Sequence, residues 1–386
     1  MNRHLIRWLA GLFLLFPGFI FAASGHRKQT VCLNMIVKNE SVVIRRCLNS
    51  IKPVIDYWVI VDTGSTDGTQ EIVRECLSSI QGELYERPWR NFGENRTEAL
   101  NLAKGKGHYL LFMDADDTLV FDNETKWPSL TKDVYMFWRG TEEFSYLKPQ
   151  LVKGSLPWRW VGVTHEYLDC AKSCTSEVLN GVKYRSGAGG ARSRDPQKFW
   201  KNVELLTEGL KKEPNNVRYM FYLAESYRDA GDKENALHWY RTRAAAGGWG
   251  EEIFCSKLQI GHLLRQTEHP IDEVIQSYQE AHRERPHRIE PIYYLAAVYN
   301  SEKRYSEAYS LLKMRQSTPI YKDTLFNEEW ISQYGLSFQL AICSYYVGCY
   351  QESLDLCDQL LAMKNLPEIW RKMTKFNRTF PLAKLN

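Results

Sequence analysis

The sequence predicts an α/β domain with a mostly parallel sheet, followed by an all-α domain of helical repeats. Two observations lead to this prediction. Apolar strand-like segments alternate with amphipathic helical segments from residue 30 to about residue 184, the pattern of βαβ units. From Pro196 onward, helical periodicity with internal repeats replaces that alternation. A chain of 386 residues has room for both domains and a short additional segment.

The N-terminal half is expected to contain four strands and three helices in alternation. Tyr109 to Met113 places five large apolar residues in a row, which suits a strand buried on both faces of a parallel sheet. The expected strands cover residues 31–37, 57–61, 84–86 and 109–113, and the expected helices cover residues 41–51, 70–79 and 95–103.

Three of these strands end in polar clusters, and ligands of open α/β sheets bind beyond the carboxyl ends of strands. Asp114 and Asp116 lie two residues apart, so in an extended chain they project to the same side and repel each other unless a cation lies between them. That geometry suits a hard divalent metal bound together with substrate phosphates. A polar turn after the strand is the alternative. The other two clusters are Asn39-Glu40 after the first strand and the segment with Asp62, Ser65 and Asp67 after the second.

A glycine-rich segment, residues 187–195, joins the two halves and carries Arg192 and Arg194. The planar guanidinium of arginine suits phosphate, so the segment could close over a diphosphate as a lid. A simple interdomain linker is the alternative.

The C-terminal half repeats small and aromatic residues at helical spacing. Small residues recur at positions 224, 261, 296 and 341, with tyrosines such as Tyr222 and Tyr299 nearby. Small residues let paired helices approach closely, and aromatic residues fill the grooves between them. The pattern favours degenerate tetratricopeptide-like repeats over a generic helical bundle.

Composition and the first residues limit the possible partners and the cellular compartment. The net charge of +4 and the absence of a long basic run argue against nucleic acid as a partner. Residues 1–25 contain Arg3 and Arg7 before an apolar stretch that ends in small residues, as in a signal peptide or, alternatively, a membrane anchor. Cys170 and Cys174 could form a disulfide in an oxidising compartment.

The three strand-end motifs together resemble the family 2 glycosyltransferases of the GT-A fold. They are residues 35–40, residues 59–69 and residues 112–117, and with the repeats the resemblance covers roughly residues 30–358. It implies a GT-A domain at residues 26–192, tetratricopeptide-like repeats at residues 193–386, and a nucleotide-sugar donor, preferably a UDP-sugar.

The resemblance also implies roles for individual residues. Asp62 corresponds to the aspartate that contacts the base, and Asp116 to the one that holds a divalent metal (Mn²⁺ or Mg²⁺) on the donor diphosphate, with Asp114 on the ribose or supporting the metal and Asp117 near it. The remaining donor-binding candidates are Asn39, Glu40, Ser65, Asp67 and Arg96. Many relatives carry Arg-Asn where this chain has Arg96-Thr97, which puts the role of Arg96 in doubt.

The catalytic base is expected in the stretch from Trp158 to Glu166. Glu166 is the candidate that removes the proton of the acceptor hydroxyl, and His165 is a candidate ligand of the metal or the diphosphate. Trp158 and Trp160 could stack on a sugar. A strand edge with core tryptophans and a solvated His-Glu pair is the alternative reading. Glu142, Glu143 and Asp169 are the alternative bases.

These expectations describe an inverting, metal-dependent glycosyltransferase acting on a glycan, lipid or protein acceptor, with the repeats as a possible protein-binding surface. A catalytically degenerate scaffold that binds nucleotide sugars is the rival. The leader predicts an exported or membrane-associated protein, with attachment facing the cytosol as second choice. Export to a periplasm would separate the enzyme from its donor, whereas a secretory lumen would place the sequons at Asn39 and Asn95 inside the site.

Overall fold

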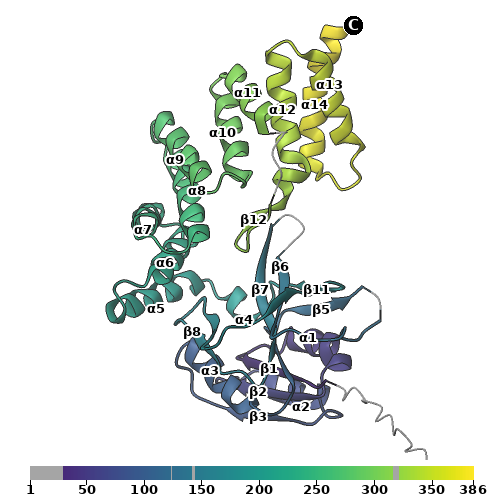
Figure 1. The fold of residues 1–386 in the computed structure, drawn as a ribbon, viewed down its shortest axis with the longest axis vertical. Coiled ribbons are helices and arrows are strands. Elements are labelled where there is room, and N and C mark those ends of the chain that lie inside the picture. The colour runs from purple at the N-terminus through teal and green to yellow at the C-terminus, as the bar shows by residue number, and fades with distance from the viewer. Residues whose placement is uncertain (1–28, 123, 141–143, 316–320) are drawn as a thin grey trace, which may run out of the picture.

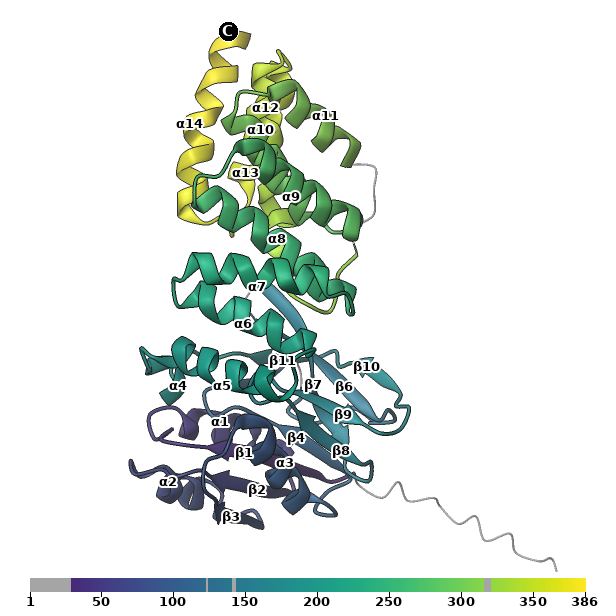
Figure 2. The same ribbon diagram turned by 90° about the vertical axis from the view of Figure 1, so that its left-hand side faces the viewer.

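The computed structural model describes residues 29–122, 124–140, 144–315 and 321–386. A sheet domain occupies one end of the elongated molecule, and the helical region rises from it as a curved stack (Figure 1). Turning the molecule shows the helices layered one above another over the sheet domain (Figure 2). The predicted fold class, a mostly parallel α/β sheet followed by tetratricopeptide-like helix pairs, is confirmed.

The central sheet has eight strands in the order β10-β6-β7-β4-β1-β2-β3, with β12 paired to β7. Strands β4, β1, β2 and β3 run parallel to one another, whereas β7 is antiparallel to both β4 and β6. The parallel strands place their carboxyl ends at one edge. The strands are β1 (Val31–Val37), β2 (Tyr57–Asp62), β3 (Gly82–Glu86), β4 (Tyr109–Phe112), β6 (Val134–Gly140), β7 (Phe144–Lys153), β10 (Ser176–Val178) and β12 (Asn327–Glu328).

Both faces of the sheet are covered, which explains the unbroken apolar character of β1 and β4. Leu33 and Met35 of β1 pack with Ile44 of α1 (Ile44–Ile51) and Val73 of α2 (Thr69–Cys76) on one face. The alternate residues Cys32 and Leu110 pack on the other face against α3 (Phe92–Ala103) and β8 (Trp158–Val161). The core therefore holds the strand ends rigidly at the carboxyl edge.

The four expected strands and three expected helices are present, with shifts at their ends. The first helix begins at Ile44 rather than at residue 41. The third begins three residues earlier than predicted, at Phe92, because the Asn91 side chain accepts a hydrogen bond from Glu94 N (2.9 Å) and caps it. The strands after β4 and their antiparallel pairing were not predicted: besides the pairs of β7 with β4 and β6, they include β5 (Thr118–Phe121) with β11 (Val182–Arg185), and β8 with β9 (Tyr167–Cys170).

The helical region consists of consecutive antiparallel pairs. The small residues of the repeat pattern lie buried on the first helix of successive pairs, where Gly261 lies so close to Tyr278 that an added Cβ would be 2.5 Å from its ring. The helices are α4 (Ala191–Arg194), α5 (Lys198–Lys212), α6 (Val217–Asp229), α7 (Lys233–Ala245), α8 (Gly250–Gln266), α9 (Ile271–Glu284), α10 (Glu290–Ser301), α11 (Tyr305–Arg315), α12 (Leu336–Tyr346), α13 (Tyr350–Ala362) and α14 (Glu368–Leu385).

The expectation that strands end before Pro196 was wrong at one place. Between α11 and α12 the chain forms β12, which pairs antiparallel with the start of β7 (Figure 1). Asn327 and Glu329 add side-chain hydrogen bonds to Ser145. The repeat stack is therefore tied back to the sheet domain at a second point. The exact domain boundary placed at residue 192 stays a prediction.

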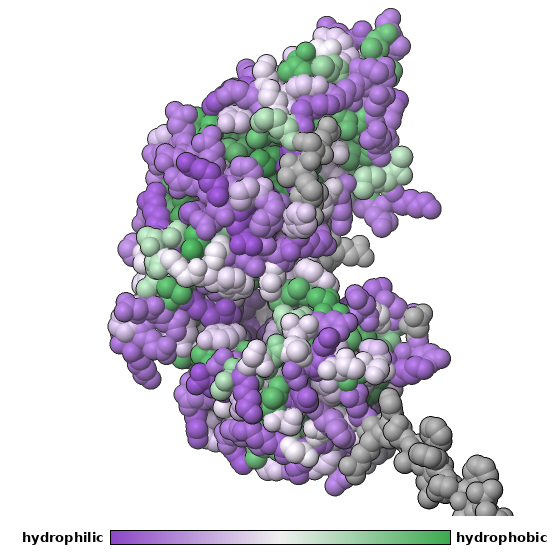
Figure 3. Space-filling view, viewed as in Figure 1, coloured by the Kyte–Doolittle hydropathy of each residue, from purple (hydrophilic) through white to green (hydrophobic). Residues whose placement is uncertain are grey.

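The proposed leader, residues 1–25, lies outside the described residues. Among the residues that are described, no helix is both long and apolar enough to cross a membrane. The face of the molecule in Figure 3 is largely hydrophilic, with apolar patches interspersed among polar residues.

Candidate active site

The predicted polar clusters meet at the carboxyl edge of the sheet, because β1 lies between β2 and β4. Asn39 joins the first two clusters: its backbone N donates to Ser65 Oγ (2.8 Å), and its side-chain Oδ1 accepts from Thr66 N (2.8 Å). Asn39 adopts a left-handed backbone (φ 57°), a conformation that asparagine tolerates better than most residues. Asn39 and Ser65 thus shape the loops around the crevice.

Asp62 ends β2 and is fully buried. Its Oδ1 accepts hydrogen bonds from Gly64 N (2.8 Å) and Ser65 N (2.7 Å). Its Oδ2 is buried without a hydrogen-bond partner in the part of the chain that the structure describes. A buried acceptor without a partner is costly, so this atom is suited to receive a donor group from a ligand.

Asp67 holds the second cluster against the first. Its carboxylate accepts from Ser41 N (3.0 Å), Thr69 N (3.1 Å) and Thr69 Oγ1 (2.6 Å). Desolvation opposes ionisation of this side chain, but these hydrogen bonds outweigh it and lower the pKa of Asp67 to about 2. The observed contacts of Asp67 are with the loops.

Asp114 meets two arginines. Its Oδ1 accepts from Arg96 Nη2 (2.5 Å), and its Oδ2 lies 3.4 Å from Nη1 and Nη2 of Arg139. Burial opposes ionisation of this carboxyl, but the two guanidinium charges prevail and hold the pKa of Asp114 well below its usual value. The cations that compensate Asp114 are therefore side chains of the protein.

Asp117 is buried in a network of its own. Its Oδ2 accepts from Arg139 Nη2 (2.5 Å) and from the Tyr184 hydroxyl (2.6 Å), and its Oδ1 accepts from Gly187 N (3.0 Å). Burial raises the pKa of Asp117 to about 6, against the opposing charge of Arg139. Only 1 % of the residue is exposed, so Asp117 organises the site rather than facing a ligand.

Asp116 differs from its two neighbours because no arginine side chain pairs with its carboxylate among the described residues. Its Oδ2 accepts from Gly190 N (3.2 Å), and Arg46 Nη2 donates to its backbone carbonyl (2.6 Å). Gly187 comes so close that an added Cβ would lie 2.0 Å from the Asp116 carbonyl oxygen. The glycines of this segment are thus required by close approach to the strand end.

The glycine-rich segment also contacts the end of β1. Ala191 N donates to Glu40 Oε2 (3.0 Å), and Arg194 Nη2 donates to the Asn39 carbonyl (3.3 Å). Burial raises the pKa of Glu40 to about 7, and the charge of Asp116 adds to the rise. Arg192 donates to Asn202 and lies over the Phe92 ring, 4.3 Å from its centroid. Residues 187–194 therefore pack on the predicted crevice.

Glu166 lies in the same charge cluster. Its Oε1 is 2.7 Å from Arg96 Nε, and 8 % of the residue is exposed. The Arg96 guanidinium lies over Trp160, 5.4 Å from the ring centroid. Arg96 thus links the carboxylate that follows β4 to the candidate base that follows β8, which gives Arg96 a clear position despite its departure from the family pattern.

His165, next to Glu166, contacts the helical region. Its ring stacks on Tyr222 of α6 with centroids 4.2 Å apart, and its Nε2 lies 3.5 Å from Asn202 Nδ2. Desolvation and the nearby charges of Arg192 and Arg218 hold the pKa of His165 well below its usual value. The ring is therefore neutral at physiological pH.

The three predicted metal ligands do not form a ready-made ligand set. Among the described residues, no group of three or more His, Cys, Asp or Glu is positioned to hold a metal ion. Asp114 is paired with arginines and His165 with aromatic and amide groups, whereas Asp116 keeps one carboxylate oxygen without a partner among the described residues. Asp116 fits a cation bound mainly by a diphosphate and water. The remaining assignments stay predictions.

One further expectation is corrected, and the structure bears on several others. Trp158 and Trp160 are each 6 % exposed and belong to the core beneath β4, so neither presents a ring for a sugar. Cys170 and Cys174 are thiols in contact with each other in this structure, and a disulfide between them stays a prediction. Asn95 is fully buried and bonded to Arg90 N and the Pro88 carbonyl, which rules out its modification in the folded chain. Of the alternative bases, Asp169 pairs with Arg159 across β8 and β9, and residues 142 and 143 lie outside the described residues.

Sequence reasoning missed the cations from β6 and β7. Arg139 contacts Asp114 and Asp117, and Lys148 lies 5.8 Å from the centroid of the Trp160 ring. Burial lowers the pKa of Lys148, and the charge of Arg139 adds to this effect. A single basic residue inside an apolar strand, as at Arg139, was the available signal.

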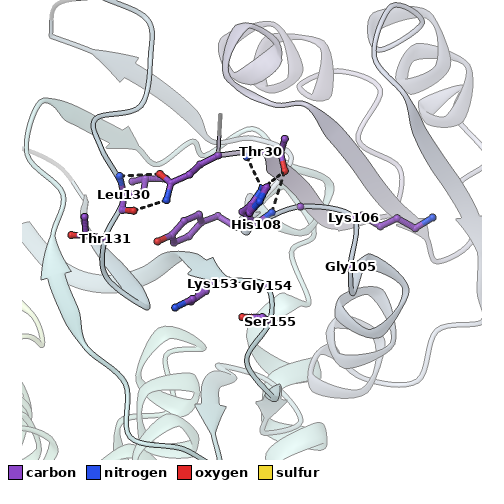
Figure 4. A pocket seen from close by; sticks show the side chains of 12 residues that line it. Thr30, Gly105, Lys106, His108, Leu130, Thr131, Lys153, Gly154 and Ser155 are labelled. Atoms are coloured by element: carbon purple, nitrogen blue, oxygen red, sulfur yellow. Dashed lines mark hydrogen bonds between the residues drawn. The ribbon is translucent and has the colours of Figure 1, made fainter. Parts of the chain in front are cut away.

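A separate cavity of about 510 Å³ opens at the opposite edge of the sheet (Figure 4). It lies at the amino ends of β1 and β4 and is lined by residues including Thr30, Lys106, His108 and Lys153. Lys106 pairs with Glu83 and Lys153 with Asp133, so both cations are already compensated. The predicted site residues lie at the other end of the strands.

Comparison with known proteins agrees with the geometry of the carboxyl edge. Residues 32–123 match the family model described as Glycosyl transferase family 2. The SPbeta prophage-derived glycosyltransferase SunS of Bacillus subtilis is 23 % identical over 234 residues, covering 56 % of this chain and 54 % of that protein. The chain thus spans about half the length of this relative.

Two further matches cover shorter parts of the chain. A TPR repeat-containing protein of Synechococcus elongatus is 34 % identical over 103 residues, which cover 26 % of this chain and 24 % of that protein. An uncharacterized glycosyltransferase of Rickettsia felis is 31 % identical over 85 residues, which cover 22 % of this chain and 28 % of that protein.

Solved structures of tetratricopeptide proteins also resemble part of the chain. YrrB, a TPR protein with an unusual peptide-binding site, gives a TM-score of 0.36 at 12 % identity and covers 46 % of this chain and 84 % of its own. A tetratricopeptide repeat protein of Parabacteroides merdae gives a TM-score of 0.37 at 17 % identity and covers 50 % of this chain and 70 % of its own chain.

Proposed function

We propose that this chain, whose N-terminal domain is that of a family 2 glycosyltransferase, transfers a sugar from a nucleotide-sugar donor to an acceptor hydroxyl with inversion at the anomeric carbon. The observation that carries the proposal is the contact of one guanidinium, Arg96, with both Asp114 and Glu166. It puts a candidate base in the same cluster as the carboxylates that face a donor.

The donor is proposed to lie along the carboxyl edge of the sheet. Asp62 Oδ2, buried without a partner among the described residues, would accept an N–H from the base, such as the N3–H of the uracil in the proposed UDP-sugar. The loops around Asn39 and Asp67 would enclose the nucleoside. Arg192 and Arg194, on the segment that contacts Asp116 and Glu40, would bind the diphosphate.

The proposed transfer step uses Glu166 as the general base. The acceptor oxygen attacks the anomeric carbon while its proton passes to a Glu166 carboxylate oxygen. The bond between the anomeric carbon and the diphosphate oxygen breaks, and the nucleoside diphosphate leaves with that electron pair. Arg96 would keep Glu166 oriented toward the acceptor while it anchors Asp114.

A divalent metal, Mn²⁺ or Mg²⁺, fits this arrangement with Asp116 as its protein ligand. Bound there, it would neutralise negative charge on the departing diphosphate. Asp114 would support the metal site without ligating the ion directly, since its carboxylate is already held by two arginines. His165 and Asp114 remain proposed contributors whose direct ligation requires a change of partners.

The test is release of UDP from a panel of UDP-sugars, with water as acceptor where no other is known. We expect Asp116→Ala to abolish release and to lose any stimulation by Mn²⁺. Asp122→Ala, an exposed aspartate paired with Lys183, serves as the matched control and should retain the wild-type rate. Full activity of Asp116→Ala would rule out the metal role.

The rival proposal, a scaffold without catalytic activity, predicts that the wild type binds UDP-sugars but releases no UDP. The helical region favours an additional protein-binding role, because helical repeats present extended surfaces to other proteins. The acceptor class (glycan, lipid or protein) and an exported or membrane-attached location are further proposals. Fractionation with N-terminal sequencing tests the location.

A further inference from the structure

The loop that carries Glu166 is held from both sides. This base loop, residues 162–166, connects β8 to β9. On one side Phe92 N donates to the Val163 carbonyl (3.1 Å), and Gly93 comes so close that an added Cβ would lie 2.2 Å from Gly162 O. The start of α3 thus forms a fixed wall, and the opposite side belongs to the helical repeats.

Helix α6 of the first repeats grips the residues directly before and after Glu166. Arg218 Nε and Nη2 donate to the His165 carbonyl at 3.1 and 2.9 Å. The same guanidinium lies over the ring of Tyr167, 5.2 Å from its centroid, and over that of Tyr222, 4.7 Å away. Tyr222 in turn stacks on the His165 ring. Two residues of one helix therefore fix both neighbours of the candidate base.

The backbone of the base loop needs such support. His165 has a left-handed conformation (φ 49°), which non-glycine residues rarely adopt and which persists only where the surroundings fix it. Val163 N also donates to the Tyr219 hydroxyl of α6 (3.2 Å). Without α6, the hydrogen bonds to the His165 carbonyl and the stacking on its ring would be lost, and of the contacts described for His165 only the one with Asn202 of α5 would remain.

The grip of Arg218 is itself anchored deeper in the repeats. Arg218 Nη1 lies 3.1 Å from Glu252 Oε1 on α8, and Glu252 Oε2 accepts from the fully buried Arg243 of α7. Because Arg243 still pairs with Glu252 when Arg218 is replaced, the helical core should survive the loss of Arg218. The role of Arg218 can therefore be separated from folding.

We infer that Arg218 and Tyr222 are positioning residues, through which the first helical repeats hold Glu166 in its productive orientation. This inference rests on the proposed function, because it gives Glu166 its catalytic role. It makes the repeat domain part of the catalytic apparatus in addition to any partner it binds. It also explains why the first helices of the stack lie against the sheet domain.

The test uses the full chain with Arg218→Ala, Arg218→Lys, Tyr222→Leu and Tyr222→Phe. We expect Arg218→Ala to lower kcat for UDP release from a UDP-sugar at least tenfold, while the UDP affinity measured by calorimetry and the KM of the donor stay within twofold. Arg218→Lys should restore only part of the rate, since an ammonium group cannot donate in a fixed fork. Tyr222→Phe keeps the stacked ring and should outperform Tyr222→Leu.

Hydrogen exchange supplies a readout that does not depend on catalysis. Amides of residues 162–167 should exchange faster in Arg218→Ala, with an unchanged melting temperature. Arg241→Ala, an exposed arginine on the neighbouring α7, is the matched control and should behave as the wild type in every measurement.

The two ways of failing are distinguishable. A wild type that releases no UDP from UDP-sugars, whether or not it binds UDP, overturns the proposed function, and exchange in residues 162–167 then still decides whether α6 holds the loop. An active wild type whose Arg218→Ala variant keeps both its rate and its slow exchange overturns the present inference alone.

Discussion

The Nε atom of Arg96 lies 2.7 Å from Glu166 Oε1, although the two residues come from different elements, α3 and the loop after β8. The other end of the same guanidinium reaches Asp114. One planar cation therefore separates two carboxylates that would otherwise repel each other across the site. The two contacts differ in kind: Nη2 donates a hydrogen bond to Asp114, whereas Nε forms an ion pair with Glu166 without hydrogen-bond geometry.

Replacing Arg96 by lysine should separate charge from geometry. An ammonium group is a point charge and cannot contact both carboxylates in the same way, so Glu166 would lose its fixed orientation. We expect kcat for UDP release to fall at least tenfold, with UDP affinity within about threefold of wild type; a tenfold change corresponds to about 1.4 kcal/mol. Steady-state kinetics and calorimetry measure the two effects.

A matched control is available on the surface near the start of α3. Arg90 lies 3.9 Å from Glu94, and its side chain is 56 % exposed, so Arg90→Lys should leave the rate unchanged. A wild-type rate for Arg96→Lys would mean that charge alone suffices at this position, and the orienting role would have to be abandoned.

Asp62→Asn tests recognition of the base. The amide oxygen can keep the hydrogen bonds that Oδ1 accepts from Gly64 N and Ser65 N, while the unpartnered Oδ2 becomes an NH₂ group that cannot accept. We expect uridine and UDP to bind roughly ten- to a hundredfold more weakly, the range for leaving a buried polar pair unmatched. Isothermal titration with UDP provides the measurement, and unchanged affinity would place the base elsewhere.

The regular elements of the sheet domain were predictable because their apolar periodicity is local. The strand at β4 and the carboxylates after it could be read directly, since five consecutive apolar residues suit only a buried strand or helix, and Gly and Asp mark the ends. The charge state of Asp114 could not be predicted. It depends on Arg96 and also on Arg139, which is 25 residues away and reaches Asp114 only after β6 pairs with β7.

For the tryptophans, the sequence suggested a role in sugar binding that the structure does not support. Trp158 and Trp160 are chemically suited to sugar, and the sequence alone does not reveal which face of β8 they occupy. In the fold they pack against Phe112 and the rest of the core, where apolar burial decides their orientation. Long-range contacts, such as that of Arg218 with the His165 carbonyl, had no local signal at all.

Arg139→Met should destabilise the fold more than the catalytic variants do. The change leaves Asp117, 1 % exposed, with the Tyr184 hydroxyl and Gly187 N but no cation, and it removes one partner of Asp114. Removing one member of a buried ion pair typically costs about 3–5 kcal/mol. Urea denaturation compared with Arg185→Met, an exposed position on β11, measures the loss. A loss below about 1 kcal/mol would show that Asp117 becomes protonated at little cost.

Because of Asp67, the free energy of unfolding should fall as the pH is lowered. Hydrogen bonds lower its folded pKa from 3.8 to about 2, so the folded chain binds the proton less tightly than the unfolded chain does. The stabilisation is therefore complete above about pH 4 and disappears as the pH falls through 2. The side chain in Asp67→Asn does not titrate in this range. At pH 6 the free energy of unfolding of this variant should be lower than that of the wild type by about 1 kcal/mol, the net value of a typical hydrogen bond.

The measurement is the difference in melting temperature between the two proteins from pH 6 to pH 2.5. Because the stabilising ionised form of Asp67 is progressively lost toward acid, that difference should narrow as the pH falls. Asp122→Asn, exposed and paired only with Lys183 in the described residues, should show little change over the same range. A difference that stays constant with pH would mean that Asp67 acts through its shape alone, and that the loops around the nucleoside crevice are not fastened by its charge.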